Sequence, residues 1–191
     1  MSALQNTAPD TAAAVRLEPF TTGDIDRLIS WIGDRESLLQ WAGPSFTFPL
    51  SRDQLVAHLD KASRPEADRL VFKVVSSGDG TTVGHIELSA INRDHRNARL
   101  SRVLIGPDSR RGQGLAAQAL NQILKIAFDD YDLNRVELYV YDFNADAIHC
   151  YERAGFRPEG LLREVVRHGD DFWNVQVMGL LARDWRRKAG L

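Results

Sequence analysis

The fold of this chain is decided by the stretch Val103-Leu104-Ile105-Gly106-Pro107-Asp108-Ser109-Arg110-Arg111-Gly112-Gln113-Gly114-Leu115-Ala116-Ala117. It leads from an apolar run, through a glycine turn, into a pattern whose apolar residues recur at helical spacing. A strand, a turn and a helix in this order bring the free N–H groups and the positive end of the helix dipole to one point. Because glycine has no Cβ, the main chain at Gly112 and Gly114 can approach a ligand closely. The stretch therefore predicts a binding site for an anion, with phosphate as the natural ligand.

The flanking patterns predict an α+β fold, in which a mainly antiparallel sheet is interrupted by one β-α-β unit. Alternating or β-rich runs predict strands over residues 15–17, 70–75, 83–91, 98–105, 136–141, 157–167 and 172–181. Helical spacing and capping residues predict helices over 25–32, from 52, over 115–128 and from 144 to 154, with a loop over 41–49. In the run 83–91, alternation places Ile86, Leu88 and Ala90 on one face and His85, Glu87 and Ser89 on the other.

Length and composition favour one domain of an ordinary globular protein. We expect residues 1–14 to be disordered, residues 15–185 to form the domain, and residues 186–191 to be a basic tail. The net charge of −2 gives no general attraction to nucleic acid or to an anionic membrane. The single cysteine, Cys150, excludes an intrachain disulfide, and the first residues lack a signal-peptide pattern. We therefore expect a cytoplasmic protein without nucleic-acid or membrane partners, for which a homodimer would be unsurprising.

Several interpretations of the glycine turn can be compared. A P-loop requires Lys and then Ser or Thr after its second glycine, and Leu115-Ala116 stands there instead. A dinucleotide fingerprint fits loosely at Gly112, Gly114 and Ala117, but it does not follow its strand directly, and the chain supplies only one β-α-β unit. A third interpretation is that the glycines only make a tight turn. The fourth is a site for the pyrophosphate of coenzyme A.

The fourth interpretation is supported by two motifs in the correct order and spacing. Arg-x-x-Gly-x-Ala at residues 111–116 is similar to the first signature of the GNAT superfamily of N-acetyltransferases. The second signature resembles Asn144-x-x-Ala147-x-x-x-Tyr151-x-x-x-Gly155-Phe156. The segments 159–163 and 179–185 resemble the branch that includes ribosomal-protein N-terminal and spermidine-type acetyltransferases. The resemblance covers about residues 15–185 and implies a single GNAT-like domain with two splayed strands.

The resemblance implies that acetyl-CoA is a co-substrate and lies between the strands that end at Ile105 and Asp142. Its pantetheine arm would pair with the main chain of Val103, Leu104 and Ile105, and Asn144 would contact the arm. Its pyrophosphate would lie on the turn, at Arg111, Gly112, Gln113, Gly114, Leu115, Ala116 and Ala117. The acetyl group would pass directly to a primary amine in a ternary complex. No metal is expected, because the five histidines are dispersed along the chain.

Two proton transfers accompany such a reaction. At pH 7 a lysine-like amine with a pKa near 10.4 needs roughly 4 to 5 kcal/mol to become neutral, whereas a peptide α-amine needs about 1 kcal/mol. The resemblance supports Tyr151 as the general acid that protonates the leaving thiolate. The general base is open: Glu87 is our first choice and Glu137 the second, with His85, Asp142 and a water relay as further options.

The acceptor amine is not identified by the sequence. A protein N-terminus, a polyamine and a small-molecule amine all remain open, although the acidic residues between 24 and 60 mildly favour a cationic amine. The aromatic residues of this region either line a pocket or belong to the core: Trp31, Trp41, Phe46 and Phe48. An alternative from another functional class is a catalytically silent module of the same fold that binds acyl-CoA and regulates.

Overall fold

The computed structural model describes residues 15–64, 66–106, 110 and 112–190, so Arg111, the predicted disordered segment 1–14 and Leu191 lie outside the described residues. The elements are β1 (Val15–Pro19), α1 (Ile25–Ser30), α2 (Arg35–Ala42), α3 (Arg52–Ala62), β2 (Leu70–Ser76), β3 (Thr82–Asn92), β4 (Asn97–Ile105), α4 (Leu115–Lys125), β5 (Arg135–Tyr141), α5 (Ala145–Ala154), β6 (Arg157–His168), β7 (Asp171–Leu181) and α6 (Ala182–Ala189). Short helical turns flank them: η1 (Thr22–Asp24), η2 (Gly43–Ser45) and η4 (Ile126–Asp130), the last with π-type geometry.

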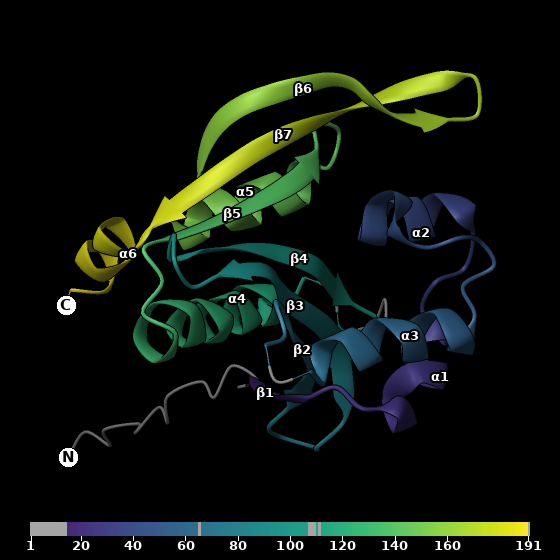
Figure 1. Cartoon of the computed structure of the whole chain (residues 1–191), viewed down its shortest axis with the longest axis horizontal. Coiled ribbons are helices and arrows are strands. Elements are labelled where there is room, and N and C mark those ends of the chain that lie inside the picture. The colour runs from purple at the N-terminus through teal and green to yellow at the C-terminus, as the bar shows by residue number, and fades with distance from the viewer. Residues whose placement is uncertain (1–14, 65, 107–109, 111, 191) are drawn as a thin grey trace, which may run out of the picture.

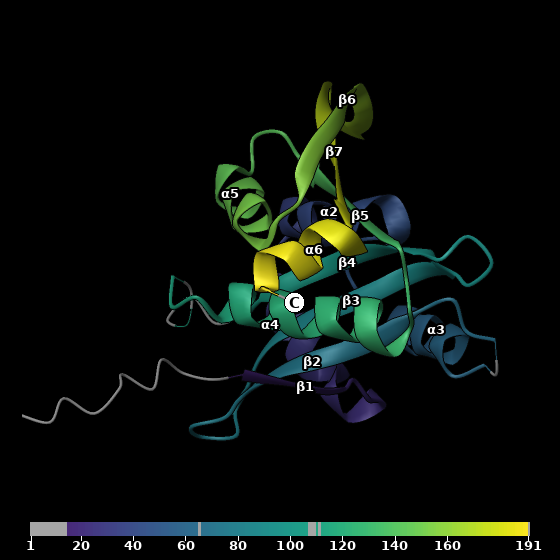
Figure 2. The ribbon, with the colours of Figure 1, turned by 90° about the vertical axis from the view of Figure 1, so that its left-hand side faces the viewer.

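The strands form one sheet in the order β1-β2-β3-β4-β5-β7-β6. β4 and β5 are parallel neighbours, joined through α4, and the other neighbouring pairs are antiparallel. This arrangement confirms the predicted α+β fold with its central β-α-β unit. The hairpin of β6 and β7 extends away from the rest of the sheet (Figure 1, Figure 2).

The two parallel strands splay apart, as expected. Their ladder runs only from Asn97 opposite Arg135 to Leu100 opposite Leu138. Beyond these pairs β5 stays bonded to β7 as far as Tyr141, while β4 stays with β3. A bulge in β4 at Arg102, whose φ is 50°, shifts the β3–β4 register and accompanies the divergence. The sheet therefore opens between β4 and β5 at its centre.

Two hydrophobic clusters cover opposite faces of the sheet. The apolar stripe of α4 predicted from the sequence lies in the larger cluster, together with Ile86 and Leu88 of β3. Helices α1, α2 and α3 form the second cluster with Val71 of β2, and Leu104 of β4 packs against it. α3 begins as the sequence predicts, since Ser51 accepts a hydrogen bond from the N–H of Gln54.

Three local expectations are corrected. The predicted loop over 41–49 begins inside α2, which Asp34 caps by accepting from the N–H of Ser37 at 2.7 Å. Ala90 is exposed and does not share the buried face of Ile86, because a second register shift with φ 49° at Ala90 turns the chain. Residues 182–189 form α6, so most of the segment we set apart as a basic tail is helical; Trp185 of α6 packs against Phe128.

Among the described residues, no helix combines the length and the apolar character that crossing a membrane requires.

Candidate active site

The glycine turn before α4 has the geometry of an anion site. Gly112 and Gly114 both have a φ of 74°, and a Cβ at either position would meet no atom within 4 Å. Gly114 is the N-cap of α4, and among the described residues no side chain caps the helix and its first turn holds no acidic residue. The first N–H groups of the helix therefore remain available to a ligand with negative charge. A pyrophosphate fits this cradle by chemistry and by space.

Of the two arginines beside the turn, only Arg110 is among the described residues. Arg110 donates a hydrogen bond to Asp79, which lies in the turn between β2 and β3, so this guanidinium has a protein partner. Arg111, the first residue of the signature, lies outside the described residues. The residue that follows β4 must be glycine, because a Cβ at Gly106 would lie 2.0 Å from Cδ2 of Trp31.

Helix α5 contributes Asn144 and Tyr151 on the same side of the sheet as α4. Asn144 caps the helix by accepting from the N–H of Ala147 at 3.2 Å, and its Nδ2 has no partner among the described residues. Tyr151 lies seven positions further along the helix and so shares the face of Asn144. Its ring packs against the larger core cluster and edge-on to Phe156. Burial raises the pKa of the Tyr151 hydroxyl, so this group is protonated at neutral pH.

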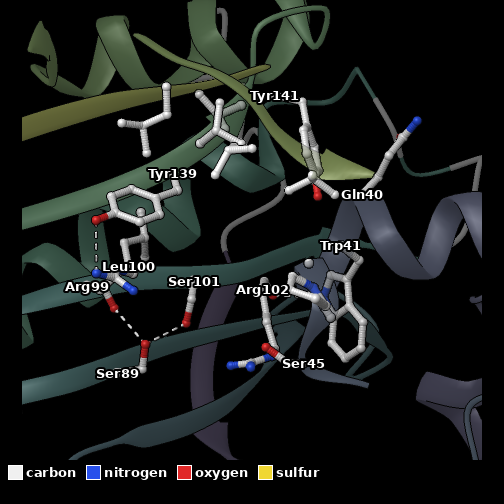
Figure 3. A pocket seen from close by; sticks show the side chains of 18 residues that line it. Gln40, Trp41, Ser45, Ser89, Arg99, Leu100, Ser101, Arg102, Tyr139 and Tyr141 are labelled. Carbon is white, nitrogen blue, oxygen red and sulfur yellow. Dashed lines mark hydrogen bonds between the residues drawn. The ribbon is translucent and has the colours of Figure 1, made fainter. Parts of the chain in front are cut away.

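A pocket of about 440 Å³ opens on the other face of the splay, toward α2 (Figure 3). Its walls are largely aromatic and aliphatic, and its floor is polar: Ser89 and Ser101 bond to each other at 2.9 Å. Leu100 and Val140, from the two diverging strands, both line it. The pocket thus lies at the opening of the sheet, opposite the turn of α4. Other lining residues include Trp41, Arg99, Arg102, Tyr139 and Tyr141.

Glu87 lies beneath this pocket in a closed polar network. One of its oxygens accepts from Nε2 of His85 at 2.9 Å, the other accepts from Arg102 at 2.8 Å, and Nε2 of His58 lies 3.0–3.1 Å from both. Nδ1 of His58 faces the guanidinium of Arg69 at 3.3 Å and must accept there, so its Nε2 carries the proton and donates to Glu87.

Burial raises the pKa of Glu87, but hydrogen bonds from His58 and His85 and the charge of Arg102 outweigh burial and hold the pKa well below its usual range. The carboxylate is 1 % exposed and both oxygens are occupied. This arrangement does not favour Glu87 as a direct proton acceptor. Two buried atoms at the edge of the network, Nδ1 of His85 and Nε of Arg102, have no partner among the described residues.

The second carboxylate considered as a base is more accessible. Glu137 is 27 % exposed, and its two oxygens accept from Arg99 at 3.0 Å and from Arg135 at 3.3 Å. Asp142, at the end of β5, accepts from Nδ2 of Asn174. In the described ranges, no group of three or more His, Cys, Asp or Glu side chains could hold a metal ion.

Sequence reasoning missed most of the pocket. Trp41 was named, but α2 that carries it was not predicted. Arg99 and Ser101 alternate on β4 with buried residues, and this period-two pattern marks one face of the strand without showing what the face meets. The bulge that turns the Arg102 side chain to Glu87 left no signal that we recognised.

Residues 14–157 match the family model described as an acetyltransferase (GNAT) domain. The chain belongs to this family. It is an acetyl-CoA-dependent N-acetyltransferase, which transfers an acetyl group to a primary amine. The structure also matches spermidine N-acetyltransferase from Vibrio cholerae in complex with CoA and spermine, with a TM-score of 0.79, 25 % identity, and coverage of 90 % of this chain and 97 % of that chain.

Relatives of this acetyltransferase act on different amines. Spermidine N(1)-acetyltransferase of Vibrio cholerae is 29 % identical over 86 % of this chain and 91 % of the relative. An L-amino acid N-acetyltransferase of Escherichia coli is 30 % identical over 61 % of this chain and 70 % of the relative. Because a triamine acetyltransferase and an amino acid acetyltransferase match at similar identity, the acceptor must be argued from the pocket.

Proposed function

We propose that this acetyltransferase holds acetyl-CoA on the α4 and α5 face of the splay, holds its amine on the α2 face, and transfers the acetyl group directly through the opening. One observation carries the proposal: the β4–β5 ladder stops at Leu100 and Leu138, between the uncapped turn of α4 and the 440 Å³ pocket. Cofactor and acceptor can therefore meet without an acyl-enzyme intermediate.

The cofactor would be held mainly by main-chain groups. Val103, Leu104 and Ile105 would pair with the pantetheine arm as an added strand, because β5 diverges from β4 at that level. The amides from Gly112 to Ala117 would bind the pyrophosphate, and Nδ2 of Asn144 would donate to the arm. When bound, acetyl-CoA supplies a thioester whose carbonyl carbon an amine can attack.

The reaction requires one proton to leave the amine nitrogen and one to reach the thiolate, and we assign a group to each transfer. As the amine nitrogen bonds to the carbonyl carbon, the C–S bond breaks and the nitrogen loses a proton. We assign Tyr151 to donate its hydroxyl proton to the departing thiolate, after which the proton lost by the nitrogen restores the hydroxyl through solvent. Glu137 is the more exposed of the two carboxylates, but both of its oxygens are paired and it is not in the described lining of the pocket, so we assign the amine's proton to a water relay. Glu87 would act through Arg102, whose position it fixes at the pocket wall.

Calorimetric titration and a thiol-release assay test this function together. We expect saturable binding of acetyl-CoA to the purified protein and release of free CoA that depends on an added amine. Absence of saturable binding would contradict the cofactor site. Binding without amine-dependent release, across a panel of primary amines, would contradict the transfer.

A further inference from the structure

The acceptor pocket has an unusual charge pattern for a protein whose relatives include polyamine acetyltransferases. Among its described lining residues there is no aspartate or glutamate, whereas two arginines, Arg99 and Arg102, contribute to the wall. The remaining polar groups are neutral hydroxyls and amides, and most of the wall is apolar. Both arginines pair with carboxylates outside the lining, Arg99 with Glu137 and Arg102 with Glu87. An acceptor in this pocket therefore meets arginine N–H donors and apolar surface, with no carboxylate oxygen in the described lining.

The same pattern continues toward solvent. A second hollow of about 310 Å³ shares Gly43 and Pro44 with the first and lies between α2 and the turn of the β6–β7 hairpin. Its described lining also lacks carboxylates, and it contains Arg35, Arg167 and His168. A ligand that extends outward from the opening of the sheet would pass Arg35 and Arg167 in this hollow.

Four of the acidic residues that suggested a cationic amine from the sequence have partners outside the pocket. Asp24 is buried against Arg27 and Lys73, and Asp34 caps α2. Asp26 bonds to Arg52 on the surface of α3. Glu36 lies 4.0 Å from Nε2 of His168, at the edge of the outer hollow, and it does not line the pocket. None of these four carboxylates is among the described residues that line the pocket.

Arg99 is the side chain best placed to bind the anionic group of an acceptor. Its guanidinium stacks on the ring of Tyr139 at 4.1 Å and bonds to the hydroxyl of that ring at 3.2 Å (Figure 3). Glu137 lies behind it and occupies Nε and one terminal nitrogen. The other terminal nitrogen, Nη1, has no partner among the described residues. A carboxylate or phosphate in the pocket could take this nitrogen with a charge-assisted hydrogen bond.

We propose that the acceptor is a monoamine with an apolar or aromatic body and one anionic group, which Arg99 recognises. A polyamine would lose the hydration of its second ammonium group and find no carboxylate to replace it. An anionic group on an apolar body instead matches both the arginine and the aromatic wall. This inference rests on the proposed acetyl transfer and names its substrate class.

Paired acceptors test the proposal in the thiol-release assay. Each carboxylate-bearing amine is compared with the amine that lacks the carboxylate: phenylalanine with phenethylamine, and leucine with isoamylamine. Spermidine and spermine complete the panel. We expect kcat/KM to be about tenfold or more higher for the anionic member of at least one apolar pair, and to be lowest for the polyamines.

The variant Arg99→Gln separates recognition from turnover. It should lower kcat/KM for the anionic member about tenfold relative to its uncharged partner, so that the preference within the pair is lost. Arg96→Gln is the matched control, since Arg96 pairs with Asp132 on the surface and does not line the pocket. It should leave the preference unchanged.

The outcomes are distinct. Turnover of spermidine with no preference for an anionic amine would overturn the inference and leave acetyl transfer standing, as would a preference that survives Arg99→Gln. Absence of turnover with every amine, despite saturable binding of acetyl-CoA, would overturn the proposed function itself.

Discussion

The two faces of the splay are built in contrasting ways. The proposed cofactor face depends on one contiguous turn and on α5, and the groups that we propose for binding are main-chain amides made available by glycine and by the start of a helix. The acceptor face gathers single side chains from α2, β3, β4, β5, β6 and β7. A site made of backbone can be recognised in a short sequence motif. A site made of side chains from many elements becomes visible only after the chain has folded.

Tyr151→Phe should produce the largest effect and should separate the two faces. Removal of the hydroxyl takes away the proposed donor to the thiolate, so kcat should fall by about 10²-fold or more. The aromatic packing against Phe156 is retained, and acetyl-CoA affinity should change by less than about threefold. Steady-state kinetics and calorimetry on the same preparation measure both quantities. An unchanged kcat would remove Tyr151 from the reaction.

Glu87→Gln probes the network beneath the acceptor face. The variant leaves Arg102 without its buried anion, and the free energy of unfolding should fall by about 3 kcal/mol at pH 7. Glu137→Gln is the control, since that partly exposed carboxylate should contribute less than about 1 kcal/mol. Urea denaturation measures both values. Equal losses in the two variants would contradict the role given to burial.

The effect of Glu87→Gln on the free energy of unfolding should depend on pH. Because the folded state lowers the pKa of Glu87 from 4.5, the ionised network stabilises the fold above pH 4.5. That stabilisation is lost as the pH falls through the folded pKa. The difference in unfolding free energy between wild type and Glu87→Gln should therefore be constant near neutrality and should shrink as the pH is lowered below about 4.5. A difference that grows on acidification would contradict this assignment.

Gly114→Ala tests whether the glycine turn before α4 binds the pyrophosphate of acetyl-CoA. Its φ of 74° makes a methyl group unfavourable by about 1 kcal/mol, and that methyl would also occupy the approach to the amides of α4. Acetyl-CoA affinity should fall about tenfold. Gly80→Ala, in the β2–β3 turn at a φ of 71°, should destabilise the fold by a similar amount and leave cofactor affinity unchanged. Equal affinities in both variants would exclude the turn as the pyrophosphate site.

Asn144→Ala should give the smallest effect. Loss of the cap on α5 should lower the free energy of unfolding by about 1 kcal/mol, and loss of Nδ2 should weaken acetyl-CoA binding by about threefold. Asp34→Ala removes an equivalent cap from α2 on the other face. It should reduce stability alike without altering cofactor affinity. A loss of affinity with Asp34→Ala would show that the two faces are coupled.

The sequence was sufficient for the fold class and most elements, because strong period signals and capping residues are local. The splay was expected only from the resemblance to the GNAT superfamily. It failed for α2, whose buried side is small, with Leu38, Trp41 and Ala42, and which is followed by Gly43. It also placed Ala90 on a buried face, because a register shift changes which residues face inward and leaves no mark in the alternation.

The candidate residues show the same limit. Alternation correctly put Glu87 on the face opposite Ile86, but it could not show that His58 of α3 and Arg102 of β4 would enclose that carboxylate. Composition likewise did not show that the acidic residues of the helical region would stand outside the described lining of the acceptor pocket. Long-range pairing decided both questions.

The central claim is that the acetyl group passes directly between the two faces of the opening. Initial velocities measured while acetyl-CoA and a turned-over amine are both varied test it most directly. Direct transfer in a ternary complex predicts double-reciprocal lines that intersect. Parallel lines, the pattern of a covalent acetyl-enzyme, would contradict the account.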